Sequence, residues 1–295
     1  MAVEGGVSRA LGDLVSGLLP LSMRELQSQI EDRLAKLPNR FNEFGYDPYG
    51  LSPEWLQHSV LPVVLLYRYW FRCRVYDIDR LPAGRVLLVA NHAGQLPFDA
   101  AMLATAMLLE ADPPRIARGM GEYFIPRLPF FSVLASRGGA MVGTPTNCAH
   151  MLDSDECVMV FPEGVRGISK TWPHRYELQR FGLGFMRLAL QTNTPIVPVG
   201  IVGSEEQAPG LANLDGLARR FGLPALPVTL TFPWLGPLGV IPLPARYHIV
   251  FGEPLHFTGD ANDEDTGIEE KVERVKAAVE ALLERGLDGR DGVFR

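Results

Sequence analysis

Cysteine is scarce in this chain: its 295 residues include three, Cys73, Cys148 and Cys157. The three are widely spaced, and no Cys-x-x-Cys pair occurs. A disulfide framework needs paired cysteines in an oxidising compartment, and a structural zinc site needs four ligands at short, regular spacing. The sequence therefore disfavours both, and we expect reduced thiols in a cytosolic protein.

Several motifs of familiar enzyme classes are also missing. No Gly-x-Ser-x-Gly occurs, and Ser204 lacks the flanking glycines that a serine hydrolase places around its nucleophile. No His-Glu-x-x-His indicates a zinc hydrolase. Gly182 and Gly184 do not complete a dinucleotide-binding Gly-x-Gly-x-x-Gly, and the stretch before Lys170 has only part of the P-loop spacing. These absences disfavour all four classes.

Positive charge is in deficit. Lysine and arginine total 28 against 34 aspartates and glutamates, which gives a formal net charge of −6 at pH 7. Proteins that bind nucleic acids need a basic surface to neutralise phosphates. We therefore expect no nucleic-acid partner.

The chain also lacks a segment suited to crossing a membrane. Glu4 and Asp13 stand where a signal peptide would have a basic flank and an apolar core, so we expect no signal peptide. The apolar segment 60–70 is shorter than the roughly 20 residues that a span needs. The segment 221–245 is uncharged and long enough, but its six prolines would break any helix. We expect this segment to be buried in protein or to lie at an interface.

Helical and strand patterns alternate along the chain. Residues 22–37 carry apolar residues at helical spacing behind a capping-box signature, Ser22 and Glu25, and a second, apolar helix is expected at 55–71. Further helices and buried strands are expected in turn, the strands at 85–90, 158–161, 195–202 and 246–251 and the helices at 97–109, 181–191 and 267–285.

This alternation predicts an α/β fold with a mostly parallel central sheet flanked by helices, an N-terminal helical arm and a C-terminal helix. We divide the chain into the arm and its linker at 1–54, a central domain at 55–260, and a C-terminal helix and tail at 261–295.

The first group of chemically active residues lies in the run Asn-His-Ala-Gly-Gln-Leu-Pro-Phe-Asp. The preceding strand ends at residue 90, so His92 falls at its carboxyl end, where open α/β sheets bind ligands. Asp99 falls in the first turn of the next helix, where the helix dipole favours an ionised carboxylate. An anionic Asp within reach of an imidazole fixes its tautomer and leaves the other ring nitrogen free to take a proton from a hydroxyl. The structural alternative is a loop histidine beside a helix-capping aspartate.

The second group is Phe-Pro-Glu-Gly-Val-Arg, with Lys170 and Arg175 soon after, and it also follows a predicted strand. Gly164 lets the backbone approach a ligand. Glu163 can accept a hydrogen bond from a hydroxyl, and Arg166 can present a planar fork to a phosphate. The alternative is a surface turn with an ordinary Glu–Arg pair.

A third piece is the proline-rich apolar strand Pro-Ile-Val-Pro-Val-Gly, which begins at residue 195. Proline is unusual in a central strand because it cannot donate to the ladder. We therefore expect Pro198 to shape a turn or a sheet edge near the site, with a purely structural role as the alternative.

In this order, the three pieces resemble the glycerolipid acyltransferase family, a lysophospholipid acyltransferase-like superfamily, over about residues 86–254. The resemblance implies that His92 is the general base for the acceptor hydroxyl and that Asp99 orients it. It implies that Glu163, Gly164 and Arg166 hold the acceptor head group. It also implies an acyltransferase domain over 55–260, acyl-CoA or acyl carrier protein as donor, and no metal or redox cofactor.

Two departures from the family pattern affect these assignments. Four residues usually separate the histidine from the aspartate, whereas six do here, although Asp99 is the only acid in that window. Between the histidine run and the Phe-Pro-Glu-Gly run, the family usually supplies a phosphate-binding arginine, and here Thr144 stands at that position. This pattern is similar to the neutral-lipid, diacylglycerol-type branch. Donor or head-group contacts are expected among Thr144, Lys170, Arg175 and Pro198.

The sequence thus predicts an enzyme that transfers a fatty acyl group from acyl-CoA or acyl carrier protein to a hydroxyl of a glycerolipid or lysophospholipid. The alternatives are a non-catalytic lipid-binding protein on the same fold and an acyl-CoA thioester hydrolase. We expect a peripheral or monotopic protein on the cytoplasmic face of the membrane. Three stretches are candidates for docking, because they join apolar or aromatic side chains with arginines or carry no charge: 60–71, 115–131 and 221–245.

Overall fold

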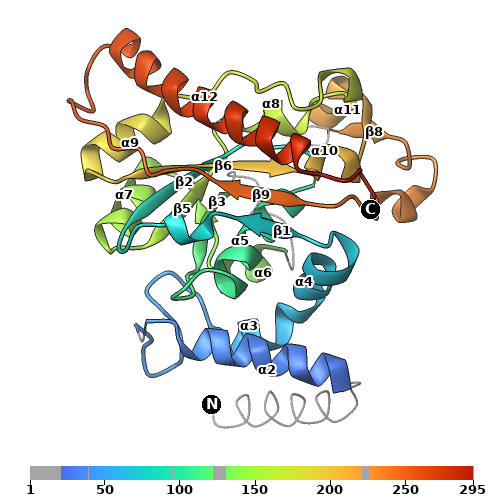
Figure 1. Ribbon diagram of the computed structural model, residues 1–295, viewed down its shortest axis with the longest axis horizontal. Coiled ribbons are helices and arrows are strands. Elements are labelled where there is room, and N and C mark those ends of the chain that lie inside the picture. The colour runs from blue at the N-terminus through green and yellow to red at the C-terminus, as the bar shows by residue number, and fades with distance from the viewer. Residues whose placement is uncertain (1–20, 39, 95, 122–130, 221–225, 295) are drawn as a thin grey trace.

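A seven-stranded sheet organises the protein, in the order β1-β9-β6-β2-β5-β3-β4 (Figure 1). The computed structural model describes residues 21–294 except 39, 95, 122–130 and 221–225. All neighbouring strands of this sheet pair in parallel except β6 and β9. The predicted α/β fold with a mostly parallel sheet is confirmed. The strands are β1 (Arg74–Tyr76), β2 (Val86–Ala90), β3 (Ala117–Gly121), β4 (Met141–Val142), β5 (Cys157–Val160), β6 (Ile196–Val202) and β9 (His248–Phe251).

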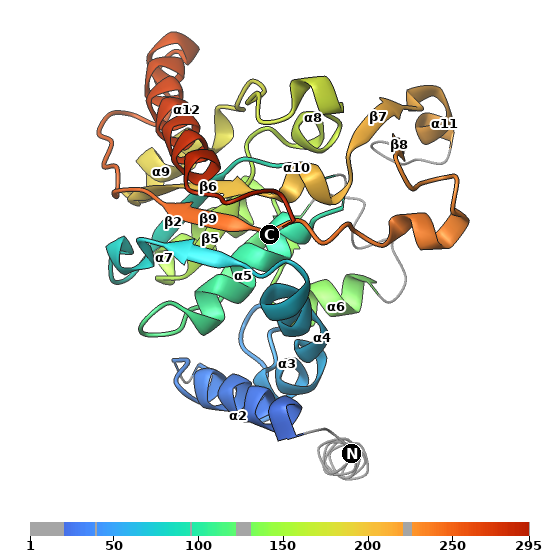
Figure 2. The ribbon, with the colours of Figure 1, turned by 45° about the vertical axis from the view of Figure 1, so that its right-hand side comes forward.

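Helices cover both faces of the sheet (Figures 1 and 2). One face carries α7 (Pro145–Asp153), α9 (Gly184–Thr192) and α12 (Asp265–Asp288). The other carries α5 (Phe98–Leu109), beyond which α2 (Leu21–Ala35), α3 (Pro53–Ser59) and α4 (Leu61–Leu65) pack. Because successive side chains of a strand point to opposite faces, Leu88 joins one core cluster while Leu87 and Val89 join the other. This is why the strand is apolar at every position.

The apolar helix expected at 55–71 is divided. It consists of α3, α4 and a π-helical turn, η1 (Leu66–Trp70). The chain leaves the first helix at Val60 and begins the next at Leu61, which places Pro62 in a first turn. Proline cannot donate its backbone nitrogen inside a helix, whereas in a first turn that donor is not needed. The helix predicted at 22–37 is α2, described over Leu21–Ala35; residues 1–20 of the arm lie outside the described residues.

Pro198 lies within β6, between β2 and β9, and not at the turn or sheet edge that we expected. Its carbonyl accepts a hydrogen bond from the Gly252 nitrogen at 2.9 Å, just past the end of β9. Val199 pairs with Phe251, and three residues earlier Ile196 pairs with Leu255, which lies four residues after Phe251. The chain that faces β6 therefore contains one extra residue between these two pairs. The missing N–H of proline thus coincides with an irregular step in the ladder, where a central strand tolerates it.

The remaining elements cluster around the carboxyl edge of the parallel strands or form short connections. They are η2 (Ile78–Arg80), α6 (Phe131–Arg137), α8 (Val165–Ile168), η4 (Trp172–His174), α10 (Ser204–Gln207), α11 (Asp215–Arg220) and η5 (Gly236–Val240), with a two-stranded sheet of β7 (Gly210–Asn213) and β8 (Pro227–Thr229). Within the described ranges, no helix has the length and apolar character that a membrane crossing requires.

The three candidate docking stretches differ in what they expose. In 60–71 most apolar side chains belong to the core, and Tyr69 and Trp70 are exposed. In 115–131 the Arg118 side chain is buried against Asp47 and Glu156, so it does not face a membrane. Residues 122–130 of that stretch, and 221–225 of the third, lie outside the described residues.

Candidate active site

His92 and Asp99 are in direct contact. The Nδ1 atom of His92 lies 2.6 Å from Oδ2 of Asp99, although six residues separate them. Asp99 is fully buried in the first turn of α5 and also accepts hydrogen bonds from the backbone nitrogens of Ala93 and Ala100. The carboxylate is therefore held by three donors, and its direction toward the imidazole is fixed.

This contact sets the chemistry of the imidazole. An ionised carboxylate accepts only, so the proton of a neutral ring resides on Nδ1 and Nε2 presents its lone pair. Among the described residues, Nε2 has no hydrogen-bond partner. Burial lowers the pKa of His92, but the charge and hydrogen bond of Asp99 outweigh it, and the pKa lies above its usual value. The ring packs against Phe161, with 4.5 Å between centroids. The arrangement suits proton transfer at Nε2.

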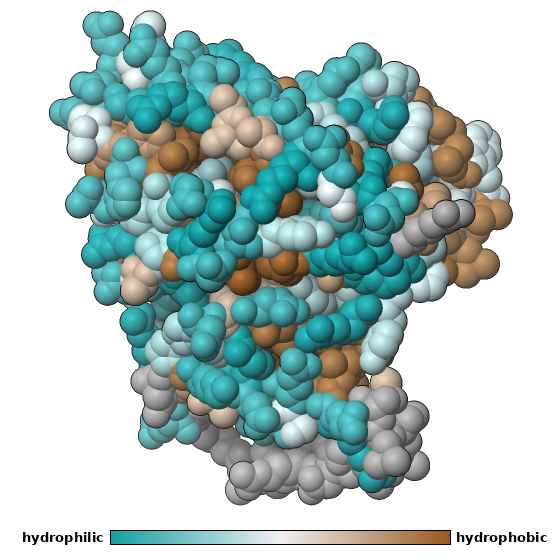
Figure 3. Space-filling view, viewed as in Figure 1, coloured by the Kyte–Doolittle hydropathy of each residue, from teal (hydrophilic) through white to brown (hydrophobic). Residues whose placement is uncertain are grey.

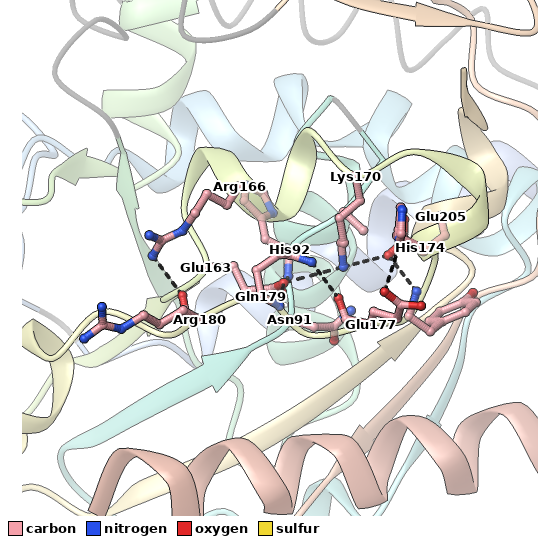
Figure 4. A network of polar contacts seen from close by, with 12 residues as sticks. Asn91, His92, Glu163, Arg166, Lys170, His174, Glu177, Gln179, Arg180 and Glu205 are labelled. Atoms are coloured by element: carbon pink, nitrogen blue, oxygen red, sulfur yellow. Dashed lines mark hydrogen bonds and ion pairs between the residues drawn. The ribbon is translucent and has the colours of Figure 1, made fainter. Parts of the chain in front are cut away.

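Buried side chains on both sides fix the His92 loop. Asn91, at the end of β2, exchanges two hydrogen bonds with the backbone of Ile201 in β6, at 2.7 and 3.0 Å. Glu163, 1% exposed, accepts from the backbone nitrogens of His92 and Gln179, both at 2.8 Å (Figure 4). We expected Glu163 to contact the acceptor. Instead both of its carboxylate oxygens accept hydrogen bonds inside the protein, where they hold the His92 loop against the Phe-Pro-Glu-Gly-Val-Arg run, which we call the second motif.

The short helix α8 packs directly on the His92 backbone. A Cβ atom added to Gly167 would lie 2.6 Å from the His92 carbonyl oxygen and 3.0 Å from the His92 Cβ. Gly164, which precedes the helix, has φ 56° and ψ −143°, a conformation available essentially to glycine alone. Both glycines of the Phe-Pro-Glu-Gly-Val-Arg-Gly run are thus needed for this close approach.

Gln207 holds the middle of the His92 loop. Its Nε2 donates to the carbonyl oxygens of Gly94 and Leu96, both at 3.3 Å, and its Oε1 accepts from the Tyr247 hydroxyl at 2.6 Å. Gly94 has φ +82°, and a side chain there would collide with Gln207 and Ser204. Gln207 thus holds this loop, which is longer than the usual family spacing, between β2 and α5.

A buried ion pair extends this network. Lys170, 7% exposed, lies 2.8 Å from Oε1 of Glu205 and 3.6 Å from Oε2 of Glu163 (Figure 4). Burial raises the pKa of Glu205, although the ammonium of Lys170 opposes this. The neighbouring Glu206 accepts from the Tyr176 hydroxyl and from Arg290. These charges are compensated inside the protein, and they tie the second motif to α10 and to the C-terminal tail.

The other predicted site residues lie around this centre. Arg166 is exposed and donates to the Arg180 carbonyl at 2.8 Å, pointing away from His92 in Figure 4. Arg175 is exposed and stacks on the Trp172 ring. Thr144 caps α7, where its hydroxyl accepts from the Asn147 nitrogen at 3.1 Å. The structure does not bring these three, or Pro198 in the sheet, into contact with His92.

A cavity of about 590 Å³ lies elsewhere, at the amino ends of the strands. It is enclosed by the linker after α2 and by the loops that lead into β2, β3 and β5. None of the residues of the two motifs lines it. Ligands of parallel sheets bind at the carboxyl ends of strands, so the candidate active site is the edge that carries His92 and not this cavity. In the part of the chain that the structure describes, no three His, Cys, Asp or Glu side chains gather as a metal site.

Sequence reasoning missed Gly167, Glu205 and Gln207. One signal for the last two was available: they follow the carboxyl end of the predicted strand at 195–202, which is the same edge of the sheet as His92. Polar residues directly after a buried parallel strand thus lie at the same edge as the motif residues.

Comparison with known proteins identifies the family. The family model described as Acyltransferase matches residues 72–202, a range that contains His92, Asp99 and the whole second motif. An uncharacterized protein of Mycobacterium tuberculosis is 38% identical over 259 residues, which cover 85% of this chain and 72% of that protein. An uncharacterized protein of Mycobacterium leprae is also 38% identical, over 85% of this chain and 70% of its own length.

More distant relatives carry functional names. The human protein called DGAT1/2-independent enzyme synthesizing storage lipids is 24% identical over 73% of this chain and 62% of its own length. The crystal structure of the 1-acyl-sn-glycerophosphate acyltransferase of Thermotoga maritima matches with a TM-score of 0.48 and 16% identity, over 95% of this chain and 89% of that chain. From the family model and the mycobacterial relatives, the chain belongs to the acyltransferase family.

Proposed function

We propose that this enzyme transfers a fatty acyl group from acyl-CoA, or from acyl carrier protein, to a hydroxyl of a glycerolipid or lysophospholipid at a membrane surface. The observation that carries the proposal is the 2.6 Å contact between His92 Nδ1 and Asp99, which leaves Nε2 as a proton acceptor at the carboxyl edge of the sheet. Membership of the acyltransferase family supports the reaction type.

In the proposed reaction, Nε2 of His92 takes the proton of the acceptor hydroxyl as its oxygen attacks the thioester carbonyl carbon. A carbon–oxygen bond forms, and the carbon–sulfur bond of the tetrahedral intermediate then breaks. The imidazolium returns its proton to the leaving thiolate, so the products are an ester and a free thiol. Asp99 stabilises the imidazolium between these steps and keeps the ring in one orientation.

Arg166, with the Gly164 backbone, is our candidate for the acceptor head group, because its guanidinium is exposed whereas Glu163 is buried. Glu163 then acts as a positioning residue that holds the His92 backbone. Thr144 and Arg175 remain candidates for donor or head-group contacts, whereas Lys170 is buried in its ion pairs with Glu205 and Glu163. The names of the mammalian relatives make neutral glycerolipids suitable acceptors to test beside lysophospholipids.

Replacing Arg166 by lysine should raise the acceptor KM about tenfold, the effect of one weakened charge-assisted hydrogen bond. The donor KM should change little, because the donor does not need that fork. Steady-state kinetics with each substrate varied in turn measure both values. Arg180→Lys is the matched control, since its side chain pairs with Glu269 on α12. Equal damage to both KM values would assign Arg166 a structural role.

Replacing Gly167 by alanine should lower kcat at least tenfold, because the new methyl group would meet the His92 carbonyl at 2.6 Å and push the catalytic loop out of position. Gly184→Ala is the control, since a Cβ there meets nothing within 4 Å. Thermal unfolding of both variants separates misplacement from unfolding. If a folded Gly167→Ala enzyme turns over normally, the close packing of α8 on His92 has no catalytic consequence.

The function is tested by incubating the protein with labelled acyl-CoA or acyl carrier protein and a panel of lysophospholipids, monoacylglycerols and diacylglycerols. Lipid mass spectrometry identifies the product, and a thiol assay follows the donor. An acyltransferase releases thiol and forms an ester in equal amounts when the acceptor is present. Thiol release without any acceptor would indicate a thioester hydrolase. Lipid binding with no turnover of any donor would indicate a non-catalytic protein.

Peripheral or monotopic association with the cytoplasmic face of a membrane completes the proposal. A lipid acceptor does not leave the bilayer readily, so the active site must reach the bilayer surface. Cell fractionation should recover the protein with membranes, and protease added to sealed vesicles should digest it only from the cytoplasmic side. Protection of a segment on the far side would contradict this.

A further inference from the structure

One loop of the protein exposes far more apolar surface than its neighbours. We name residues 230–241 the apolar loop; it connects β8 to the segment before β9 and contains η5. Trp234 and Leu238 are each 67% exposed. Figure 3 shows apolar side chains gathered over this part of the molecule, at the right-hand edge. The exposed large apolar residues of the loop are Leu230, Trp234, Leu235, Leu238, Val240 and Ile241.

The polar groups of the apolar loop are turned inward. The Trp234 indole nitrogen donates to the Thr229 carbonyl at 3.1 Å, although the ring is exposed. The Thr231 hydroxyl donates to the Gly239 carbonyl at 2.8 Å, and the backbone nitrogens of Leu235 and Ile241 donate to carbonyls within the loop. In water, such groups could form hydrogen bonds with solvent. In hydrocarbon they need hydrogen-bond partners within the protein. These internal hydrogen bonds lower the cost of placing the loop in an apolar medium.

The apolar loop is joined to the active site. Its continuation, Leu243, donates its backbone nitrogen to the Gln207 carbonyl at 2.7 Å, and the Gln207 side chain holds the His92 loop. On the other side, the Trp70 indole donates to the Pro242 carbonyl at 3.1 Å. Trp70 and the exposed Tyr69 extend the apolar surface. A surface in contact with this loop would thus lie beside the carboxyl edge where His92 sits.

We propose that the apolar loop, with Tyr69 and Trp70, inserts into the hydrocarbon boundary of a lipid bilayer and so presents the His92 edge to lipid substrates. The inference rests on the proposed function, because it takes the acceptor to be a lipid held in a bilayer. It deepens that function by naming the docking element among the three stretches that the sequence left open.

The charge pattern fits a bilayer better than a protein surface. Residues 221–245 include no Asp, Glu, Lys, Arg or His, so the apolar loop itself carries no charge that could set the register of a protein partner. Tryptophan and tyrosine are side chains that favour the membrane interface. Because docking through this loop is apolar, it should persist on uncharged phosphatidylcholine vesicles and at high salt.

The test compares the wild type with the double variant Leu235→Asp, Leu238→Asp. Both side chains are exposed, so the fold should tolerate the change. Co-sedimentation with phosphatidylcholine vesicles should fall about 100-fold, since each substitution removes one inserting side chain worth roughly tenfold in partitioning. Phe44→Asp is the matched control: Phe44 is 60% exposed in the linker between α2 and α3, and its variant should bind as the wild type does.

Two further measurements keep the outcomes distinct. Trp234 fluorescence, isolated by comparison with Trp234→Phe, should be quenched by vesicles with brominated acyl chains. Turnover of donor and acceptor dispersed in detergent micelles should be unchanged in the double variant. Vesicle binding that survives the double substitution would overturn the inference while leaving the proposed function intact. A wild-type dimer that the double variant converts to a monomer, with vesicle binding kept, would assign the loop to a second copy and overturn it as well. Absence of turnover in vesicles and in micelles alike, with normal docking, would instead contradict the proposed function.

Discussion

Replacing His92 by alanine is expected to lower kcat by about 10²- to 10⁴-fold, the range that a positioned general base supplies. The reason is local geometry: Nε2 is the atom that Asp99 leaves unprotonated, and within the described residues no other imidazole contacts Asp99. KM values for donor and acceptor should change little, because the proton is moved only in the transition state. Ester formation measured by lipid mass spectrometry gives the ratio.

Two companion variants make this result interpretable. His92→Gln keeps a polar side chain and should lose activity equally, since an amide is not a base at neutral pH. His174→Ala removes an exposed imidazole that pairs with Glu177 and should leave kcat unchanged. Near-normal turnover of a folded His92→Ala enzyme would remove His92 from the mechanism.

The sequence predicted the His92–Asp99 neighbourhood because both residues are placed by local structure. A buried strand ends at Ala90 and a helix begins at Phe98, and a loop this short between them confines the histidine and the aspartate to one small region. The same local logic predicted β2, β5, β6, β9 and α12, whose apolar patterns are long or continuous. Short strands such as β1 and β4 carry too few residues for a pattern and were not predicted.

The support of the site could not be predicted in the same way. Gln207 reaches the loop across 113 residues of sequence, and Glu163 reaches His92 across 71. The position of Gln207 after a predicted strand places it at the right edge of the sheet, but its hydrogen-bond partners depend on which strands become neighbours, which no local pattern reveals. From the sequence, Glu163 is interpreted as a ligand for the acceptor. In the structure its carboxylate is buried and accepts hydrogen bonds from two backbone nitrogens. A glutamate is seldom buried unless it finds such partners, so its residue type alone does not predict the burial of Glu163.

Pro198 illustrates the same limit for the fold. Proline as a residue type predicts an edge or a turn, whereas the apolar run around it predicts a buried central strand. The structure has the buried strand, β6. The conflict is resolved by the extra residue opposite it, between Gly252 and Leu255, which the sequence does not announce. Conversely, Pro62 lies where its residue type suggests, in the first turn of α4.

Asp99→Asn is expected to lower kcat by about 10²- to 10⁴-fold as well, through the tautomer of His92 and not through substrate binding. An amide nitrogen in place of Oδ2 would donate to Nδ1 and force the ring proton onto Nε2, where it blocks the base. The KM values should stay near those of the wild type. Asp153→Asn, at an exposed carboxylate that pairs with Arg85, is the matched control and should be silent.

The pH dependence separates this mechanism from a loss of structure. Burial lowers the pKa of His92, but Asp99 raises it by charge and hydrogen bond, and the net shift is upward. The Asp99→Asn enzyme loses the charge, so the acidic limb of its residual kcat profile should move to lower pH. Because the raised pKa stabilises the folded state at low pH, that contribution is present below the unfolded value of about 6.5 and is lost as pH rises through the folded value. The difference in unfolding free energy between wild type and variant should therefore shrink with rising pH.

A purely structural role of Asp99 would give a different kinetic result. Asp99 also accepts from the backbone nitrogens of Ala93 and Ala100, so a purely structural aspartate would lower kcat by loosening the loop. That role would leave the acidic limb of the profile where it is and would raise KM together with the loss of kcat. If Asp99→Asn behaves in that way, or retains full activity, the carboxylate serves the backbone of the loop and another group orients His92. A shifted limb with unchanged KM values leaves the imidazole as the group through which Asp99 acts.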